Sequence, residues 1–66
     1  MKVQFDRDND SLYFRLNASK IEDSSEVAPG VILDFDLAGS VVGFELLQVS
    51  RRTPEVDLKK MEYELV

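Results

Sequence analysis

The side chains of this 66-residue sequence that could carry out chemistry are mostly carboxylates, because it holds 13 Asp and Glu residues but no His and no Cys. Thiolate catalysis, hydroxyl–imidazole catalysis, disulfides and zinc sites made of thiolates or imidazoles are therefore excluded. Carboxylates can bind a hard cation such as Mg²⁺ or Mn²⁺. They can also act as general acid and base when burial separates their pKa values.

One group of acids has a spacing that suits such chemistry. Asp34, Asp36 and Glu45 are expected on one face of a β-sheet, beside a notch at Gly43, where a metal-dependent hydrolase could use them. The alternative is a hydrated or inter-subunit face whose acids pair with arginines. We favour this alternative because most charged faces are simply hydrated. The sequence therefore predicts no metal, no cofactor and no catalytic residue.

A second group of acids lies near the N-terminus. Asp6, Asp8 and Asp10 alternate as the first ligands of a calcium loop do. The sixth position of that loop would be Ser11, where a glycine is needed, and the twelfth would be Asn17, where a glutamate belongs. We therefore predict a plain hairpin turn at these residues.

Two stretches of alternating apolar and polar residues, 1–16 and 31–46, must position these acids. A period of two is typical of strands with one buried face. Turn-forming residues interrupt each stretch, including Gly39 in the second, so each predicts a β-hairpin. Pairing Phe5 with Leu12 places the large apolar side chains of the first hairpin on one side. The predicted core is Val3, Phe5, Leu12, Phe14, Leu16, Val31, Leu33, Phe35, Val42, Phe44 and Leu46.

The register of the second hairpin follows from pairing Asp36 with Val41. This pairing places Phe35 opposite Val42 on the apolar side. Ile32 and Val41 then share the other face with the acids. A face of this mixed character suits coverage by the C-terminal tail or by another subunit.

The small size of the chain favours a partner. A domain this short buries only about 60% of the surface of its unfolded chain, and this sequence has no disulfide to compensate. We therefore predict a homodimer, formed through a sheet edge or the mixed face. The predicted interface residues are Tyr13, Ile32, Val41 and Tyr63, and the alternative for the two tyrosines is an ordinary half-exposed strand position.

The rest of the chain is less regular. Residues 17–30 predict a polar crossing segment, with a short strand around 25–28 left open. Residues 54–59 predict a helical turn and 61–66 a strand, whereas the rival prediction is one helix from Pro54 to the end. The predicted fold is a single, mostly β domain over residues 1–66. It is a four- to five-stranded antiparallel sheet of hairpins with one short helical turn near the C-terminus.

The charge balance limits the partners. With 8 Lys and Arg against 13 acids, the net charge is -5, and the sequence lacks the basic stripe that nucleic acid requires. It also lacks an apolar run long enough to span a membrane and an apolar segment of the kind found in signal peptides. We therefore expect a cytoplasmic protein that binds neither nucleic acid nor membranes.

Several motifs resemble one family. They are Phe5-Asp6, Asp10, Leu12-Tyr13-Phe14, the run Glu26–Asp36 with its Pro-Gly and Asp-x-Asp, Gly39, Val41–Leu47, and Val49-Ser50 with Arg51 or Arg52. Together they resemble a small prokaryotic family catalogued as domain of unknown function 2283. The resemblance implies a compact β-rich domain of unassigned activity, in some cases encoded beside small toxin-like proteins. It carries no catalytic residues to this sequence.

Three functions therefore stand as hypotheses. We favour a non-enzymatic, self-associating protein-interaction module. The first alternative is an acidic partner that neutralises a small basic toxin-like protein, since opposite charges steer association. The second is the carboxylate-based hydrolase.

Overall fold

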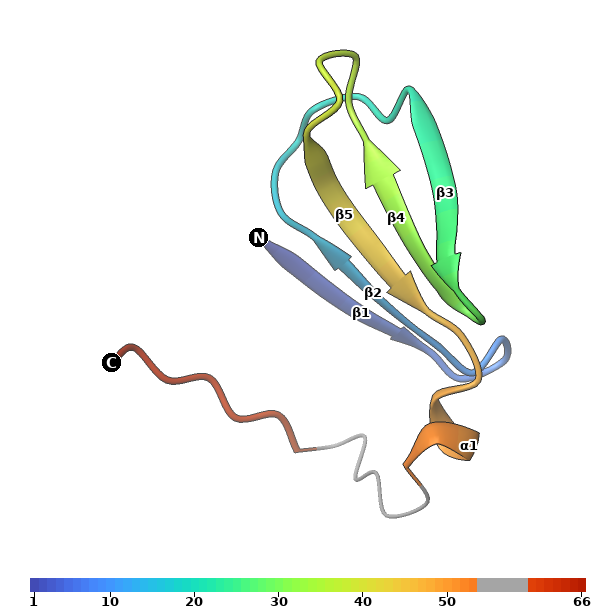
Figure 1. The fold of residues 1–66 in the computed structure, drawn as a ribbon. Coiled ribbons are helices and arrows are strands. Elements are labelled where there is room, and N and C mark those ends of the chain that lie inside the picture. Colours follow the sequence, from blue (N-terminus) through green and yellow to red (C-terminus); the bar gives the residue numbers. More distant parts are fainter. Residues whose placement is uncertain (54–59) are drawn as a thin grey trace.

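The computed structural model describes residues 1–53 and 60–66. Its elements are β1 (Lys2–Asp6), β2 (Ser11–Arg15), β3 (Asp23–Ala28), β4 (Val31–Phe35), β5 (Val41–Leu46) and α1 (Val49–Arg52). The five strands form one antiparallel sheet in the order β1-β2-β5-β4-β3, with α1 at one end of it (Figure 1). The predicted fold class is confirmed. None of the helices in the described residues is long and apolar enough to cross a membrane.

The first hairpin has the predicted register, with Phe5 opposite Leu12. Its turn closes on Asp6, whose carboxylate accepts hydrogen bonds from the backbone N–H groups of Asp8 (3.0 Å) and Asn9 (3.2 Å). The side-chain amide of Asn9 donates a third bond to the same carboxylate at 2.7 Å. Asp and Asn thus form the turn by binding its backbone, as predicted for these residue types.

The bonds to Asp6 predict how this turn responds to acid. The Asn9 side chain, and then the Asn9 backbone N–H, lower the pKa of Asp6 below its ordinary value of 3.8. Since the folded pKa is the lower one, the contribution of Asp6 to stability is complete above 3.8 and is lost as the pH falls through the folded value. An NMR titration should find the Asp6 pKa below 3.8, and Asn9→Ala should raise it. An unchanged pKa in that variant would contradict this cause.

The second hairpin follows the predicted register over most of its length. Leu33 lies opposite Phe44, and Asp34 lies opposite Gly43. These pairs place the apolar and the polar side chains of the hairpin on opposite faces, as the alternation predicts.

The predicted register is wrong at the loop end of this hairpin. Both the backbone N–H of Asp36 (3.0 Å) and its carboxylate (2.9 Å) bond Ser40, so Ser40 rather than Val41 closes the loop. Phe35 consequently pairs with Val41, and Val42 is the extra residue of a β-bulge. Because paired residues share a face of the sheet, Val41 lies on the side of Phe35 and not with the acids.

The two hairpins join through β2 and β5, with Phe14 opposite Phe44. The rings of these two residues stack with centroids 4.6 Å apart. The register therefore brings the apolar side chains of both hairpins together on one side of the sheet. We call this side the phenylalanine face; it comprises Val3, Phe5, Leu12, Phe14, Leu16, Val31, Leu33, Phe35, Phe44 and Leu46.

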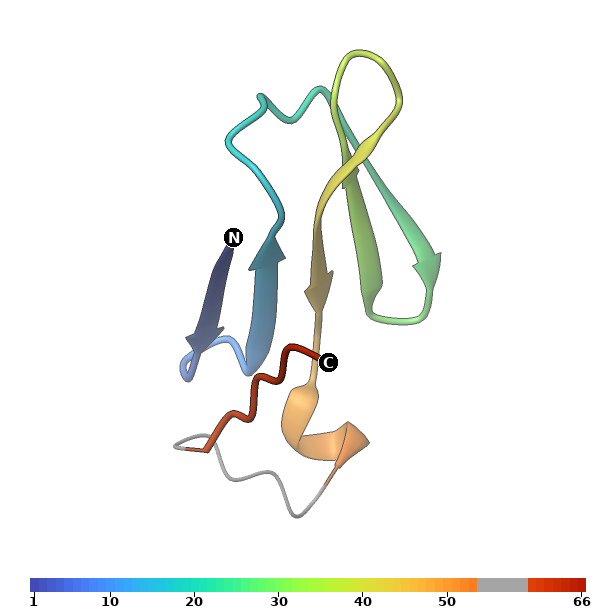
Figure 2. The same ribbon diagram turned by 90° about the vertical axis from the view of Figure 1, so that its left-hand side faces the viewer.

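The phenylalanine face is not an enclosed core, which corrects the prediction. Among the described apolar residues only Val42 and Val49 are buried, whereas Val3 is 36% and Leu16 44% exposed. The reason is that the described part of the chain forms a single layer (Figure 2), and a sheet needs a second layer to bury a face.

The fifth strand is not the predicted one. Residues 61–66 form no strand, and the described residues 60–66 form no helix either, so neither prediction for them is correct. The fifth strand is β3, which includes the short strand left open at residues 25–28. The predicted helical turn at 54–59 lies outside the described residues, and the observed helix precedes it at Val49–Arg52.

Because β3 occupies residues 23–28, the crossing segment is shorter than predicted; residues 17–22 carry the chain from β2 to the far edge of the sheet (Figure 2). The guanidinium of Arg15 donates hydrogen bonds to the carbonyl oxygens of Asn17 (2.7 Å) and Ser19. At the far end, the N–H of Glu22 bonds the carbonyl of Phe35 at 2.8 Å. This last bond starts β3 on the outer side of β4.

Candidate functional site

A row of polar residues crosses the sheet on the side opposite the phenylalanine face. Arg15 of β2 lies opposite Gly43 of β5, Gly43 lies opposite Asp34 of β4, and Asp34 lies opposite Ser24 of β3. Together with Tyr13, these residues form what we call the Asp34 cluster. It contains the one buried carboxylate among the described residues, since Asp34 is only 7% exposed.

The Asp34 cluster is built around the missing side chain of Gly43. A Cβ atom placed there would lie 3.4 Å from the Tyr13 hydroxyl and 3.4 Å from an Asp34 carboxylate oxygen. The tyrosine therefore reaches over the glycine, as aromatic side chains commonly do in sheets. Arg15 donates a hydrogen bond to the Tyr13 hydroxyl at 3.3 Å, and Ser24 donates one to Asp34 at 2.6 Å.

The polar side chains of the cluster find their hydrogen-bond partners within the described chain. Among the described residues that are not exposed, no buried side-chain nitrogen or oxygen lacks a partner. Arg15 also donates hydrogen bonds to two carbonyl oxygens of the crossing segment. A satisfied network of this kind stabilises one arrangement of the strands.

The three acids proposed as metal ligands are not assembled by the fold. Asp34 bonds Ser24, Asp36 bonds the backbone of its own loop at Ser40, and Glu45 lies opposite Ile32. Within residues 1–53 and 60–66, no three His, Cys, Asp or Glu residues are grouped closely enough to hold a metal ion.

The predicted interface residues are dispersed. Tyr13 and Ile32 are half-buried on the side of the Asp34 cluster, whereas the bulge places Val41 on the other side. Tyr63 is 73% exposed in the C-terminal segment. The prediction that these four residues lie at an interface stays a prediction.

A contact that the sequence analysis missed joins the first turn to the helix. The Asp10 carboxylate accepts hydrogen bonds from the backbone N–H (3.1 Å) and the hydroxyl (2.6 Å) of Ser50, and its carbonyl accepts one from the Val49 N–H at 3.0 Å. Gln48, at the N-cap position, makes no side-chain cap bond. Asp10 therefore caps α1 from 40 residues away, and no spacing rule in the sequence predicts it.

A second missed contact joins the helix to the turn between β3 and β4. Arg52 donates hydrogen bonds to the carbonyls of Leu47 (2.7 Å) and Pro29 (2.5 Å). Its guanidinium lies where a side chain at Gly30 would project, and Gly30 has a φ of +72°. The helix is thus attached to the β1–β2 turn through Asp10 and to the β3–β4 turn through Pro29.

A family model described as "Protein of unknown function (DUF2283)" matches residues 2–50. The chain belongs to the DUF2283 family. The matched segment includes all five strands and both residues of the Asp10–Ser50 contact, so the resemblance seen in the sequence is confirmed. Residues 60–66 lie beyond the DUF2283 match. Neither the curated proteins nor the solved structures contain a match to this chain.

Proposed function

We propose that this DUF2283 chain is a non-enzymatic interaction module that self-associates through its phenylalanine face. The observation that carries the proposal is the single-layer sheet, whose apolar side lacks a covering element in the described residues. Large apolar faces of this kind mark interaction sites in soluble proteins. A second copy of the same face is the occupant we infer, because an isologous contact covers both copies at once.

The exposure of individual side chains supports this proposal. On the phenylalanine face Val3 is 36% and Leu16 44% exposed, and Val41, on the same side, is 39% exposed. Contact with a second copy would remove this apolar surface from water, which favours association.

The opposite side of the sheet is a poorer interface. There, the Asp34 carboxylate already has its partner in Ser24, and Arg15 is bound to the crossing segment. Opening these bonds to reach a partner would leave polar groups unsatisfied, which costs free energy. The phenylalanine face has no such bonds to break.

A charge placed on the phenylalanine face provides the test. Val3 belongs to the phenylalanine face and is 36% exposed, so Val3→Glu should leave the single chain folded. A carboxylate buried between two copies would be desolvated, and we expect the dimer dissociation constant to rise at least about 10-fold. The matched control is Ser19→Glu, which adds the same charge at an exposed position of the crossing segment, away from β1. Light scattering over a concentration series measures the effect.

The proposal makes two demands on these data. The native chain must have the mass of a dimer at micromolar concentration, and only Val3→Glu may shift it towards the monomer while circular dichroism stays unchanged. A native monomer, or equal weakening by both variants, would overturn the proposal.

A further inference from the structure

We propose that residues 60–66 of one copy add as a sixth strand to the β1 edge of a second copy. This inference deepens the proposed function and rests on self-association, but it uses a sheet edge rather than the phenylalanine face. The reciprocal addition, each tail on the other copy, would be a symmetric exchange.

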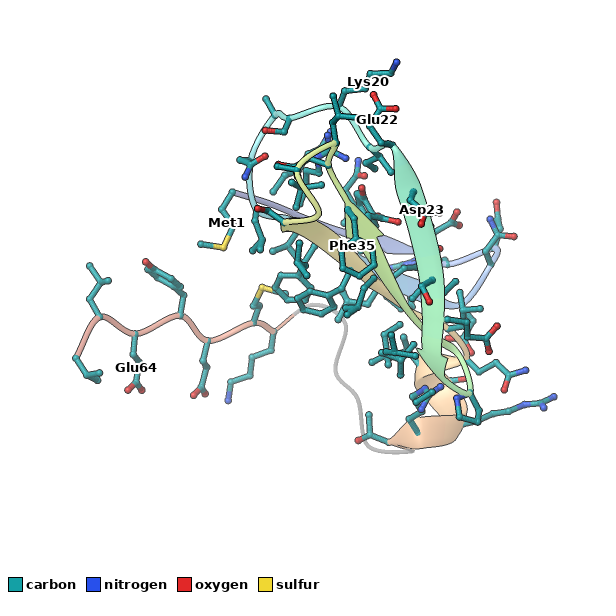
Figure 3. The ribbon with its side chains drawn as sticks, turned by 45° about the horizontal axis from the view of Figure 1, so that its top comes forward. Met1, Lys20, Glu22, Asp23, Phe35 and Glu64 are labelled. Atoms are coloured by element: carbon teal, nitrogen blue, oxygen red, sulfur yellow. The ribbon has the colours of Figure 1, made fainter. Side chains whose placement is uncertain are left out.

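The C-terminal segment has the pattern of a strand and lacks a partner. Met61, Tyr63 and Leu65 alternate with Glu62 and Glu64, and alternation with period two is typical of a strand with one buried side. In the structure these side chains stand alternately to either side of an extended chain (Figure 3). Met61, Tyr63 and Leu65 are 62%, 73% and 87% exposed, respectively. Only contact with a partner would bury them.

The sheet offers two outer edges, and charge distinguishes them. The β3 edge carries Asp23 and Glu26, which would repel the acidic tail. The β1 edge carries Lys2 near its start and Asp6 at its end, so its charges cancel, whereas β3 carries two acids and no base. Opposite charges on adjacent strands attract, so tail glutamates placed beside Lys2 would be stabilised. An exposed edge also presents unpaired backbone groups that another strand can bind. The acidic tail therefore favours β1.

The alternation of the tail also matches that of β1. Val3 and Phe5 of β1 lie on the phenylalanine face, and Lys2 and Gln4 lie on the other side. A tail paired in this sense extends the phenylalanine face with its apolar residues and brings its glutamates beside Lys2. In the single chain the β1 edge is unpaired although the tail belongs to the same molecule, so we assign the tail to a second copy.

The experiment uses the absence of cysteine from the native sequence. A nitroxide attached through Val66→Cys labels the end of the tail without altering its glutamates. The chain that carries this nitroxide contains no ¹⁵N and is mixed with the ¹⁵N-labelled native chain. Broadening of the amide signals then reports only contacts between copies. We expect the Lys2–Asp6 amides to lose about half of their intensity or more, and the Asp23–Ala28 amides to be unaffected.

A charge exchange tests the choice of edge. Lys2→Glu in the ¹⁵N-labelled chain should reduce the broadening, and Glu62→Lys in the nitroxide chain should restore it. The matched control is Lys20→Glu, which makes the same charge change on the crossing segment, where Lys20 pairs with Glu22.

Each other outcome overturns the inference. Broadening of the β3 amide signals would place the tail at the β3 edge, contrary to the inference. Broadening of β1 only when one chain carries both labels would mean that the tail folds back on its own sheet. A chain that is dimeric by light scattering but shows no broadening of β1 would overturn the strand addition and leave the phenylalanine-face dimer in place, whereas a native monomer would overturn both.

Discussion

Gly43→Ala is expected to lower the free energy of unfolding by about 2–3 kcal/mol, as overpacking of a filled site does. The added Cβ would lie 2.8 Å from the backbone carbonyl oxygen of Phe14 on the adjacent strand. That oxygen cannot retreat without moving β2 away from β5. The same Cβ would also press on the Tyr13 hydroxyl and the Asp34 carboxylate, 3.4 Å away, and so disturb the Asp34 cluster.

The measurement is chemical denaturation at one fixed protein concentration, because self-association contributes to apparent stability. Gly39 provides the control, since it has open space around it but a φ of +84°. Asparagine tolerates this conformation better than alanine, so Gly39→Asn should be milder than Gly39→Ala. At Gly43, where space is limiting, the larger side chain should be worse, so Gly43→Asn should destabilise the chain more than Gly43→Ala. Gly43→Asn milder than Gly43→Ala, or a Gly43→Ala variant as stable as the native chain, would refute this account.

Asp10→Ala is expected to lower the free energy of unfolding by about 2–3 kcal/mol, combining two losses. Removing the carboxylate leaves α1 without its cap at Ser50, and loss of a cap costs about 1–2 kcal/mol. Asp10 also has a φ of +50°, a conformation that costs alanine about 1 kcal/mol more. The Val49 side chain, one of two buried apolar side chains in the described residues, should then become accessible.

Two further variants separate these contributions. Glycine adopts a positive φ without strain, so the free energy of unfolding of Asp10→Gly should fall only by the contribution of the cap. Asp8→Ala changes an exposed acid of the same turn whose carboxylate makes no hydrogen bond in the described structure, and it should have little effect. Hydrogen exchange of the Ser50 amide gives the local readout. If Asp10→Ala and Asp8→Ala were equally stable, and the Ser50 amide equally protected in both, the cap would have no energetic role.

The strands of the two hairpins could be predicted because their pattern is local. Alternation alone pairs Phe5 with Leu12 and Leu33 with Phe44, since any slip by one residue would move the apolar side chains to the wrong face. The polar environment of Asp34 opposite Gly43 followed from the same register. The prediction failed at the loop end, where Asp36 bonds Ser40. The pairing there is shifted by one residue, and Val42 is the extra residue of the bulge.

The fifth strand could not be predicted from pattern. Asp23–Ala28 is a strand because the outer edge of β4 pairs with it, although its residues are mostly polar on both sides. Residues 61–66 alternate regularly and yet form no strand in the single chain, where they pair with neither edge of the sheet. Strand formation depends on a hydrogen-bonded neighbour as well as on side-chain alternation.

From the sequence by itself one learns which side chains share a face, that thiol and imidazole chemistry is absent, and to which family the chain belongs. Only the tertiary structure decides that Asp10 meets Ser50, that Arg52 holds the turn at Pro29, and that the phenylalanine face is left uncovered by the described residues. The physical reason is the separation of the interacting residues along the chain. Alternation acts between residues close in the chain, whereas these contacts depend on how β2 docks on β5 and on how few layers so short a chain can build.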